Sequence, residues 1–412
     1  MAIRLLVAGG ALCLASRSVW MARADWLASG DLPDLARAIK MEPRDGSLLA
    51  LDAIYRNDNG DLSPAIDQEL LRAGELNPLD SRVPMTLGLR AEFRGDLQHA
   101  EAYLLRAVQL DAQFKPSWTL ANFYVRRNQP EKAWPLLRHC LELEPLGYSP
   151  DPIFDLCWDT EADARRILAL VPKRNPRLIQ YLSYLVRTNK VAAAAEVWPE
   201  ALAIADPTSD EELGLLRPLP GFLARGGHAS AALHMWNRLV DRGMVHAAAL
   251  NPSKGLTLAD PQFQFGLTED PFGWVISEPE GVFGSNVEST LRFELNGNEP
   301  EAFEMLHTTA AVTEGQNYKL NWEADGSQLS MPQDPGFRFN IRQSDLPQAA
   351  VVECPPLLAS GNAGACQFTA PESTDSQGST LMRVTLSYSR APGTTRPQGV
   401  LRLRKISVEP VR

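Results

Sequence analysis

One stretch decides the fold of the first half: residues 87–107, which read Leu87-Gly-Leu-Arg-Ala-Glu-Phe-Arg-Gly-Asp-Leu-Gln-His-Ala-Glu-Ala-Tyr-Leu-Leu-Arg-Ala107. At its centre, Gly95-Asp96 has the residues of a tight turn. On either side of the turn, apolar residues recur at helical spacing over about a dozen positions. The stretch therefore predicts a helical hairpin.

The ending of this hairpin recurs along the chain. A small residue holds the same place in the second helix at Ala38, Ala73, Ala107, Cys140 and Ala201. The first four are 35, 34 and 33 residues apart, and the gap of 61 before the fifth is close to two repeats. Proline follows five positions after three of them, and proline ends a helix, while a small residue permits close helix packing. This period predicts a stack of hairpins.

The hairpins resemble the tetratricopeptide repeat family over about residues 21–245. The matching positions of the first helix are Leu87-Gly88 and Leu120-Ala121 with Tyr124, and those of the second helix are Ala100, Leu104, Ala107, Ala194, Trp198 and Ala201. The resemblance implies a right-handed α–α solenoid, which we assign to residues 23–247. It also implies an extended groove that binds a protein partner.

The character of the sequence changes after about Asn251. Helical periodicity stops, and short alternating runs appear, such as Tyr318-Lys-Leu320-Asn-Trp322. This predicts an antiparallel β-sandwich over residues 263–412, with residues 248–262 as a linker. A phase shift before Ile406-Ser-Val408 predicts a β-bulge in the last strand.

This second half resembles the jelly-roll carbohydrate-binding modules of families 4 and 9. The resemblance lies in Pro271-Phe-Gly-Trp274 and in Gly315-Gln-Asn-Tyr318-Lys-Leu-Asn-Trp322. Such modules hold a structural calcium, but here cationic Arg404 and Lys405 occupy the last strand, so we expect no metal site. Together the two halves resemble tetratricopeptide proteins encoded alongside bacterial exopolysaccharide machinery.

Sugar binding needs exposed aromatic faces. The aromatic residues at alternating strand positions are predicted to face inward, between the two sheets: Phe293, Tyr318, Trp322, Phe337 and Phe339. Trp274 and Phe283 lie in turn-rich stretches and are the candidates for glycan contact, although packing in the core or a loop is the favoured interpretation of Trp274.

The N-terminal segment, residues 1–22, has the features of an export signal. Arg4 precedes an uncharged run from Leu5 to Ala15, which has the length of a signal-peptide core and falls short of a typical membrane span. Ala22-Arg23-Ala24 offers a cleavage site, yet the first repeat helix already begins at Ala24. A removed signal peptide and an uncleaved membrane anchor are both compatible with the segment. Either one predicts a periplasmic or envelope-associated protein.

The cysteines fall into two pairs. Cys354 and Cys366 bracket a segment that contains proline and glycine, and in an exported domain this predicts a disulfide. Cys140 replaces the small residue of the repeat, and Cys157 lies on the next helix. The sequence leaves open whether these two are bridged or are free buried thiols.

Arginines recur near the end of the first helix of several hairpins, among them Arg94, Arg126, Arg127 and Arg187. One interpretation is that they complement the helix C-terminus. The other is that they form a basic rim for an acidic peptide or polysaccharide. The net charge of −10 argues against nucleic acid as a partner.

No enzyme motif is present in the sequence. The six histidines lack metal-ligand spacing, and there is neither a phosphate-binding glycine loop nor a nucleophile elbow. We therefore predict a non-enzymatic envelope scaffold without metal or cofactor, whose helical array binds a protein partner and which serves exopolysaccharide assembly or export. The alternative is a glycan receptor whose β-sandwich binds polysaccharide.

Overall fold

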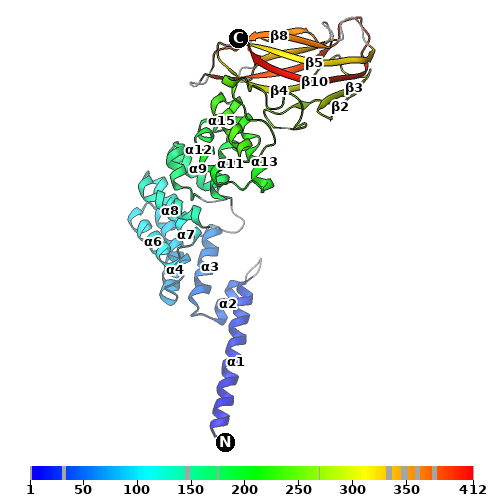
Figure 1. Ribbon diagram of the computed structural model, residues 1–412. Coiled ribbons are helices and arrows are strands. Elements are labelled where there is room, and N and C mark those ends of the chain that lie inside the picture. Colours follow the sequence, from blue (N-terminus) through cyan, green and yellow to red (C-terminus); the bar gives the residue numbers. More distant parts are fainter. Residues whose placement is uncertain are drawn as a thin grey trace. The chain divides into compact units, whose positions relative to one another are not determined.

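The chain has the predicted architecture, helical hairpins followed by an antiparallel β-sandwich (Figure 1). The computed structural model describes residues 2–29 (2–13 as backbone only), 34–143, 149–173, 176–268, 270–330, 336–344, 351–357, 362–373 and 378–411. The chain divides into two compact units, residues 1–162 with 169–172, and residues 163–168 with 173–412.

The first unit is built from hairpins. Its helices are α1 (Ala2–Ala28), α2 (Leu35–Met41), α3 (Gly46–Asp58), α4 (Pro64–Leu76), α5 (Arg82–Phe93), α6 (Leu97–Leu110), α7 (Phe114–Arg126), α8 (Pro130–Glu142) and α9 (Asp151–Thr160). Ala73, Ala107 and Cys140 are buried, as the repeat spacing predicts. The first two also accept a hydrogen bond from the residue that ends their helix, because the backbone N–H groups of Asn77 and Asp111 donate to their carbonyls.

Gly88 explains why α5 and α6 pack so closely. A Cβ atom at this position would lie 2.7 Å from Cγ of Leu104 and 3.2 Å from the carbonyl oxygen of Ala100. Both distances are shorter than ordinary van der Waals contact, and Leu104 is itself buried. Only glycine lets the two helices of this hairpin approach to this distance.

α1 is the first helix of the first hairpin. Arg17 donates two hydrogen bonds to the Glu42 carboxylate, at 2.5 and 2.6 Å, and Nε1 of Trp20 donates to the carbonyl of Met41 at 3.0 Å. The candidate cleavage site Ala22-Arg23-Ala24 therefore lies within a helix already packed on α2, with Ala24 buried. Most of the uncharged run, up to residue 13, lies outside the side chains that the structure describes. Among the described residues, no helix combines the length and apolarity that a membrane span requires.

The remaining helices are α10 (Ala164–Leu170), at the division between the units, and α11 (Arg177–Arg187), α12 (Val191–Ile204), α13 (Asp210–Leu216), α14 (Leu219–Arg225) and α15 (Ala229–Asp241) in the second unit. Trp198 and Trp236 are buried between helices, as their repeat positions predict. The Trp236 ring also lies 5.1 Å from the ring of Phe272, and its Nε1 donates to the carbonyl of Ala248 at 3.3 Å. The last hairpin is thus packed on the segment that leads into the strands.

Two five-stranded antiparallel sheets form the sandwich within the described residues, in the orders β1-β4-β9-β6-β7 and β2-β3-β10-β5-β8. The strands are β1 (Val275–Ile276), β2 (Val282–Val287), β3 (Thr290–Asn296), β4 (Ala302–Thr313), β5 (Asn317–Ser330), β6 (Phe337–Gln343), β7 (Val352–Pro356), β8 (Ala363–Thr369), β9 (Ser379–Ser389) and β10 (Gln398–Pro410). Without β1 and β2, the orders β4-β9-β6-β7 and β3-β10-β5-β8 are those of a jelly roll.

The predicted inward-facing aromatic residues form the core of the sandwich. All five are buried, and the rings of Trp322 and Phe339, from opposite sheets, lie 5.2 Å apart. The predicted bulge in the last strand is confirmed, because the pairing of β10 with β5 shifts register between Leu403 and Lys405. Alternation along the strands thus places one side of each sheet in the core.

Residues 248–262, the linker of the sequence analysis, are packed on the strands. The Thr257 hydroxyl donates to the carbonyl of Val408 at 2.5 Å, and the N–H of Ile406 donates to the carbonyl of Pro261 at 3.0 Å. Leu258 and Ala259 are buried. The change after Asn251 therefore marks the end of the helices inside one compact unit.

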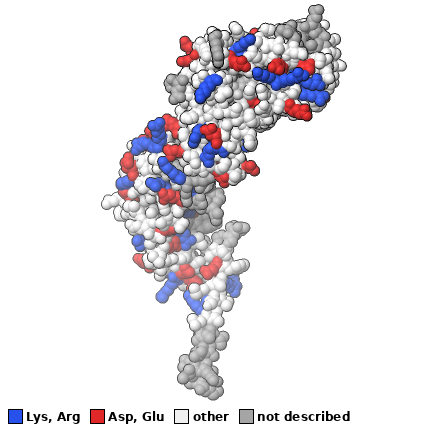
Figure 2. Space-filling view, in the orientation of Figure 1, with Lys and Arg blue, Asp and Glu red and all other residues white. Residues whose placement is uncertain are grey.

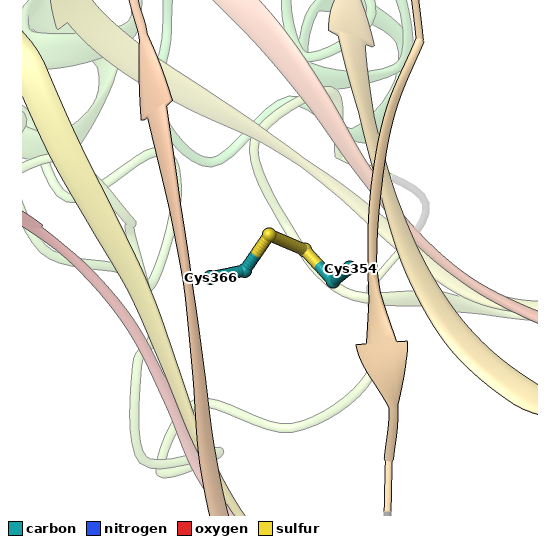
Figure 3. The surroundings of a disulfide bond; sticks show 2 residues. All are labelled: Cys354 and Cys366. Carbon is teal, nitrogen blue, oxygen red and sulfur yellow. A yellow bond between two sulfur atoms is a disulfide. The ribbon is translucent and has the colours of Figure 1, made fainter.

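The structure joins Cys354 of β7 to Cys366 of β8 by a disulfide, with their Cα atoms 5.4 Å apart (Figure 3). β7 is the edge strand of one sheet and β8 is the edge strand of the other. The bridge therefore links the two sheets of the sandwich along one edge.

Candidate functional site

A groove on the first unit, here called the α3–α5 groove, has a cavity of about 240 Å³ lined by Asn57, Leu62, Leu89, Arg90, Phe93 and Arg94. Its apolar side chains are unusually exposed: Leu62 at 60%, Leu89 at 41% and Phe93 at 77%. Leu89 and Phe93 are four residues apart on α5, so they form one ridge along the helix. Clustered exposed apolar side chains of this kind are typical of protein interaction sites.

The floor of the groove is a buried arginine. The Arg90 side chain is only 6% exposed, and its Nε donates to Oδ1 of Asp67 at 2.7 Å. Its Nη1 donates to Oδ1 of Asn57 at 2.7 Å and its Nη2 to the carbonyl of Ser63 at 2.8 Å. These bonds reach from α5 to α3, to α4 and to the loop that carries Leu62. The groove is thus held in shape before any partner arrives.

The contact between Arg90 and Asp67 recurs one repeat later in a different chemical form. The Tyr124 hydroxyl donates to Oε1 of Glu101 at 3.0 Å. Within each pair, the two residues are 23 positions apart in the sequence. Burial, with the Glu101 carboxylate beside it, raises the pKa of Tyr124 to about 12, so its hydroxyl remains a donor at neutral pH. Neither pair was predicted from the sequence. The sequence carries a signal for them, because the repeat spacing of 34 residues places an acidic side chain at position 67 and again at position 101.

Three of the predicted rim arginines are paired with carboxylates of the preceding hairpin. Arg94 Nη1 lies 2.6 Å from Oδ2 of Asp67, and Arg126 donates two hydrogen bonds to Glu92, at 3.0 and 2.8 Å. Arg127 reaches the same Glu92 at 3.4 Å. Neither interpretation from the sequence anticipated this role, which is to tie neighbouring hairpins together.

The fourth, Arg187, ends α11, where its charge complements the helix C-terminus. Figure 2 shows Lys and Arg interleaved with Asp and Glu over the helices, without a continuous basic stripe on the face in view.

The two candidate glycan contacts differ sharply in exposure. Trp274 is 1% exposed, its Nε1 donates to the carbonyl of Asp260 at 2.5 Å, and its ring lies 5.3 Å from that of Phe263. Trp274 therefore offers no platform for a glycan and is packed in the core, which is the interpretation that the sequence favours for it. Phe283, on β2 at the edge of its sheet, is 61% exposed and stays a candidate.

Cys140 and Cys157 are free and buried in the structure. Burial raises the pKa of each thiol to about 12, so neither is a reactive thiolate at neutral pH. Among the described residues, no group of three or more His, Cys, Asp and Glu side chains is placed to hold a metal ion.

Neither a protein-family model nor a curated relative matches the sequence. Among solved structures, YrrB, a TPR protein with an unusual peptide-binding site, is similar at 14% identity, over 50% of this chain and 91% of its own, with a TM-score of 0.26. PilW, a type IV pilus biogenesis factor, is similar at 14% identity, over 49% and 94%, with a TM-score of 0.25. A CBM4 structure is similar at 11% identity, over 38% and 100%, with a TM-score of 0.25.

Proposed function

We propose that this protein is a non-enzymatic scaffold whose helical array binds a protein partner at the α3–α5 groove. The occupant that we propose is an amphipathic helix of the partner, which lays its apolar face along Leu62, Leu89 and Phe93. The observation that carries the proposal is the exposure of Phe93, 77%, beside a cavity whose floor is fixed by Arg90.

The energetics favour one dominant anchor. Covering a phenylalanine side chain fully contributes roughly 1.5–3 kcal/mol, and anchors of this kind carry most of the affinity of an interface. Leu89 and Phe93 form a helical ridge, and a second helix packs well against such a ridge. Because Arg90 and Asp67 already form an ion pair, the groove is preformed, and binding costs little conformational entropy of its side chains.

The cellular setting that we propose is the bacterial envelope, with a role in exopolysaccharide assembly or export. It rests on the signal-like N-terminus and on the resemblance described above. A glycan receptor based on the β-sandwich is the weaker candidate, since Trp274 is buried and Phe283 alone remains of the two predicted platforms.

The test compares Phe93→Ala with Leu79→Ala. Leu79 is exposed to the same degree, 76%, but does not line the groove, so both variants lose similar exposed apolar surface. The full chain and both variants are used to capture proteins from envelope extract. We expect one partner to be retained by the wild type and by Leu79→Ala and lost with Phe93→Ala. Equal retention by all three would refute the groove as the binding site.

A further inference from the structure

A second cavity, of about 320 Å³, lies inside the second unit, between α14 and the sheet that contains β4, β9 and β6. One wall is helical and carries Pro218, Gly221 and Arg225. The other wall carries polar side chains of the strands, among them His307, Thr309, Arg342 and Arg383. A cavity of this size lies at the small end of ligand-binding sites.

Strand register brings the polar side chains of the sheet wall together. Arg383 of β9 pairs directly with Thr309 of β4 on one side and with Arg342 of β6 on the other. Directly opposite residues share a face of the sheet, and His307, two positions before Thr309, shares it as well. Two arginines opposite each other repel, so this arrangement costs stability unless negative charge is near.

The charges around the cavity are only partly compensated. Glu304 pairs with Arg383 and lies 3.3 Å from Nδ1 of His307. The proximity of His307 and Arg383 lowers the pKa of Glu304 to about 2, so it is ionised. Asp270 also lines the cavity: burial raises the pKa of its carboxyl, while the charge of Arg217, which is not a lining residue, lowers it.

Arg225 and Arg342 have no carboxylate partner among the residues that the structure describes. The described part of the cavity therefore has an excess of positive charge. The buried Ser344 hydroxyl, also on the lining, lacks a hydrogen-bond partner within the same described residues.

The helical wall is held close to the strands by a tight contact. A Cβ atom at Gly221 would lie 2.8 Å from Cγ of Pro271, so α14 reaches this segment only because residue 221 is glycine. The neighbouring Phe272 is buried, with its ring 5.1 Å from that of Trp236 on α15. α14, whose last turn carries Arg225, is thus held against the segment that leads into β1.

We infer that this cavity binds an oxyanion, a carboxylate or a phosphate, on a small polar ligand such as an acidic sugar. Arg225 from the helix and Arg342 from the sheet neutralise the anion, and the hydroxyls of Thr309 and Ser344 bond to its polar groups. Guanidinium groups form strong charge-assisted hydrogen bonds with such anions. The site needs no exposed aromatic platform, because charge supplies the recognition. It is separate from the α3–α5 groove, so it does not rest on the proposed protein partner.

The test is isothermal titration of the full chain with glucuronate, glucose 6-phosphate and glucose at low ionic strength. We expect one or both anionic sugars to bind with Kd below about 1 mM and glucose to give no signal. Binding of glucuronate alone assigns a carboxylate, and binding of glucose 6-phosphate alone assigns a phosphate. Either result supports the inference.

Arg225→Gln and Arg342→Gln should each weaken binding about tenfold or more, as the loss of a hydrogen bond to a charged group predicts. Arg402→Gln, on β10 of the other sheet, is the matched control for charge and should bind as the wild type does. Circular dichroism checks that each variant is folded, and the two arginine variants on opposite walls serve as independent tests. Absence of binding by both anionic sugars, equal binding of glucose, or binding unchanged in both variants would overturn the inference.

Discussion

Asp67→Asn is the perturbation that tests the floor of the α3–α5 groove. The Asp67 carboxylate accepts from buried Arg90 at 2.7 Å and from half-exposed Arg94 at 2.6 Å. Breaking a buried ion pair costs about 3–5 kcal/mol. Arg90 keeps its bonds to Asn57 and Ser63, so we expect about 2–3 kcal/mol from this pair, with the exposed Arg94 pair adding less than about 1 kcal/mol. The variant should still fold, but the first unit should be markedly less stable.

Differential scanning calorimetry of the full chain measures this loss. For a unit of this size, about 2–3 kcal/mol lowers the melting temperature by roughly 5–10 °C. Glu196→Gln is the control, because Glu196 pairs with Arg165 at 3.0 Å where both side chains are largely solvent-exposed, and it should shift the melting temperature very little. If Asp67→Asn melts as the wild type does, the ion pair between Arg90 and Asp67 does not hold the groove in shape.

Further predictions concern packing and the cysteines. Gly88→Ala should destabilise the first unit by about 1–3 kcal/mol through overpacking. Gly214→Ala should be neutral or stabilising, because a Cβ atom there meets no other atom within 4 Å. Urea unfolding of the two variants distinguishes these outcomes. Replacing Cys354 and Cys366, 12 residues apart, together with alanine should lower the stability of the β-sandwich by about 3 kcal/mol; an unchanged unfolding midpoint would count against the bridge. Because burial raises the pKa of Cys140 from an ordinary 9.0 to about 12, its neutral thiol contributes stability below pH 9 that is lost as pH rises towards 12. Cys140 should therefore resist iodoacetamide at pH 8 until the chain unfolds, and rapid labelling of the native protein would show that the thiol is accessible.

The sequence was sufficient to predict the structural features that depend on local residue patterns. The spacing of Ala73 and Ala107 predicts the hairpins, because a small residue at a helix contact repeats with the structural unit. Alternation predicts the strands and even the bulge after Leu403. The positions of Cys354 and Cys366 predict the disulfide, although the sequence could not show that this bridge links two sheets.

The features that the sequence could not supply depend on contacts between distant elements. Trp274 lies beside turn residues, which made it a candidate for exposure, but its indole N–H donates to the backbone carbonyl of Asp260 and the ring packs inward. The role of Arg90 depends on which carboxylate faces it from the preceding hairpin. The cavity next to Arg342 depends on how closely α14 approaches the sheet, which Gly221 decides.

The central claim is that a protein partner contacts this chain at the α3–α5 groove. Photo-crosslinking in the cell measures this most directly, with a benzophenone amino acid at position 93 and, as control, at the equally exposed position 79. We predict a discrete adduct with one protein from position 93 and none from position 79. Adducts of equal yield from both positions, or an absence of adducts from position 93, would contradict the claim.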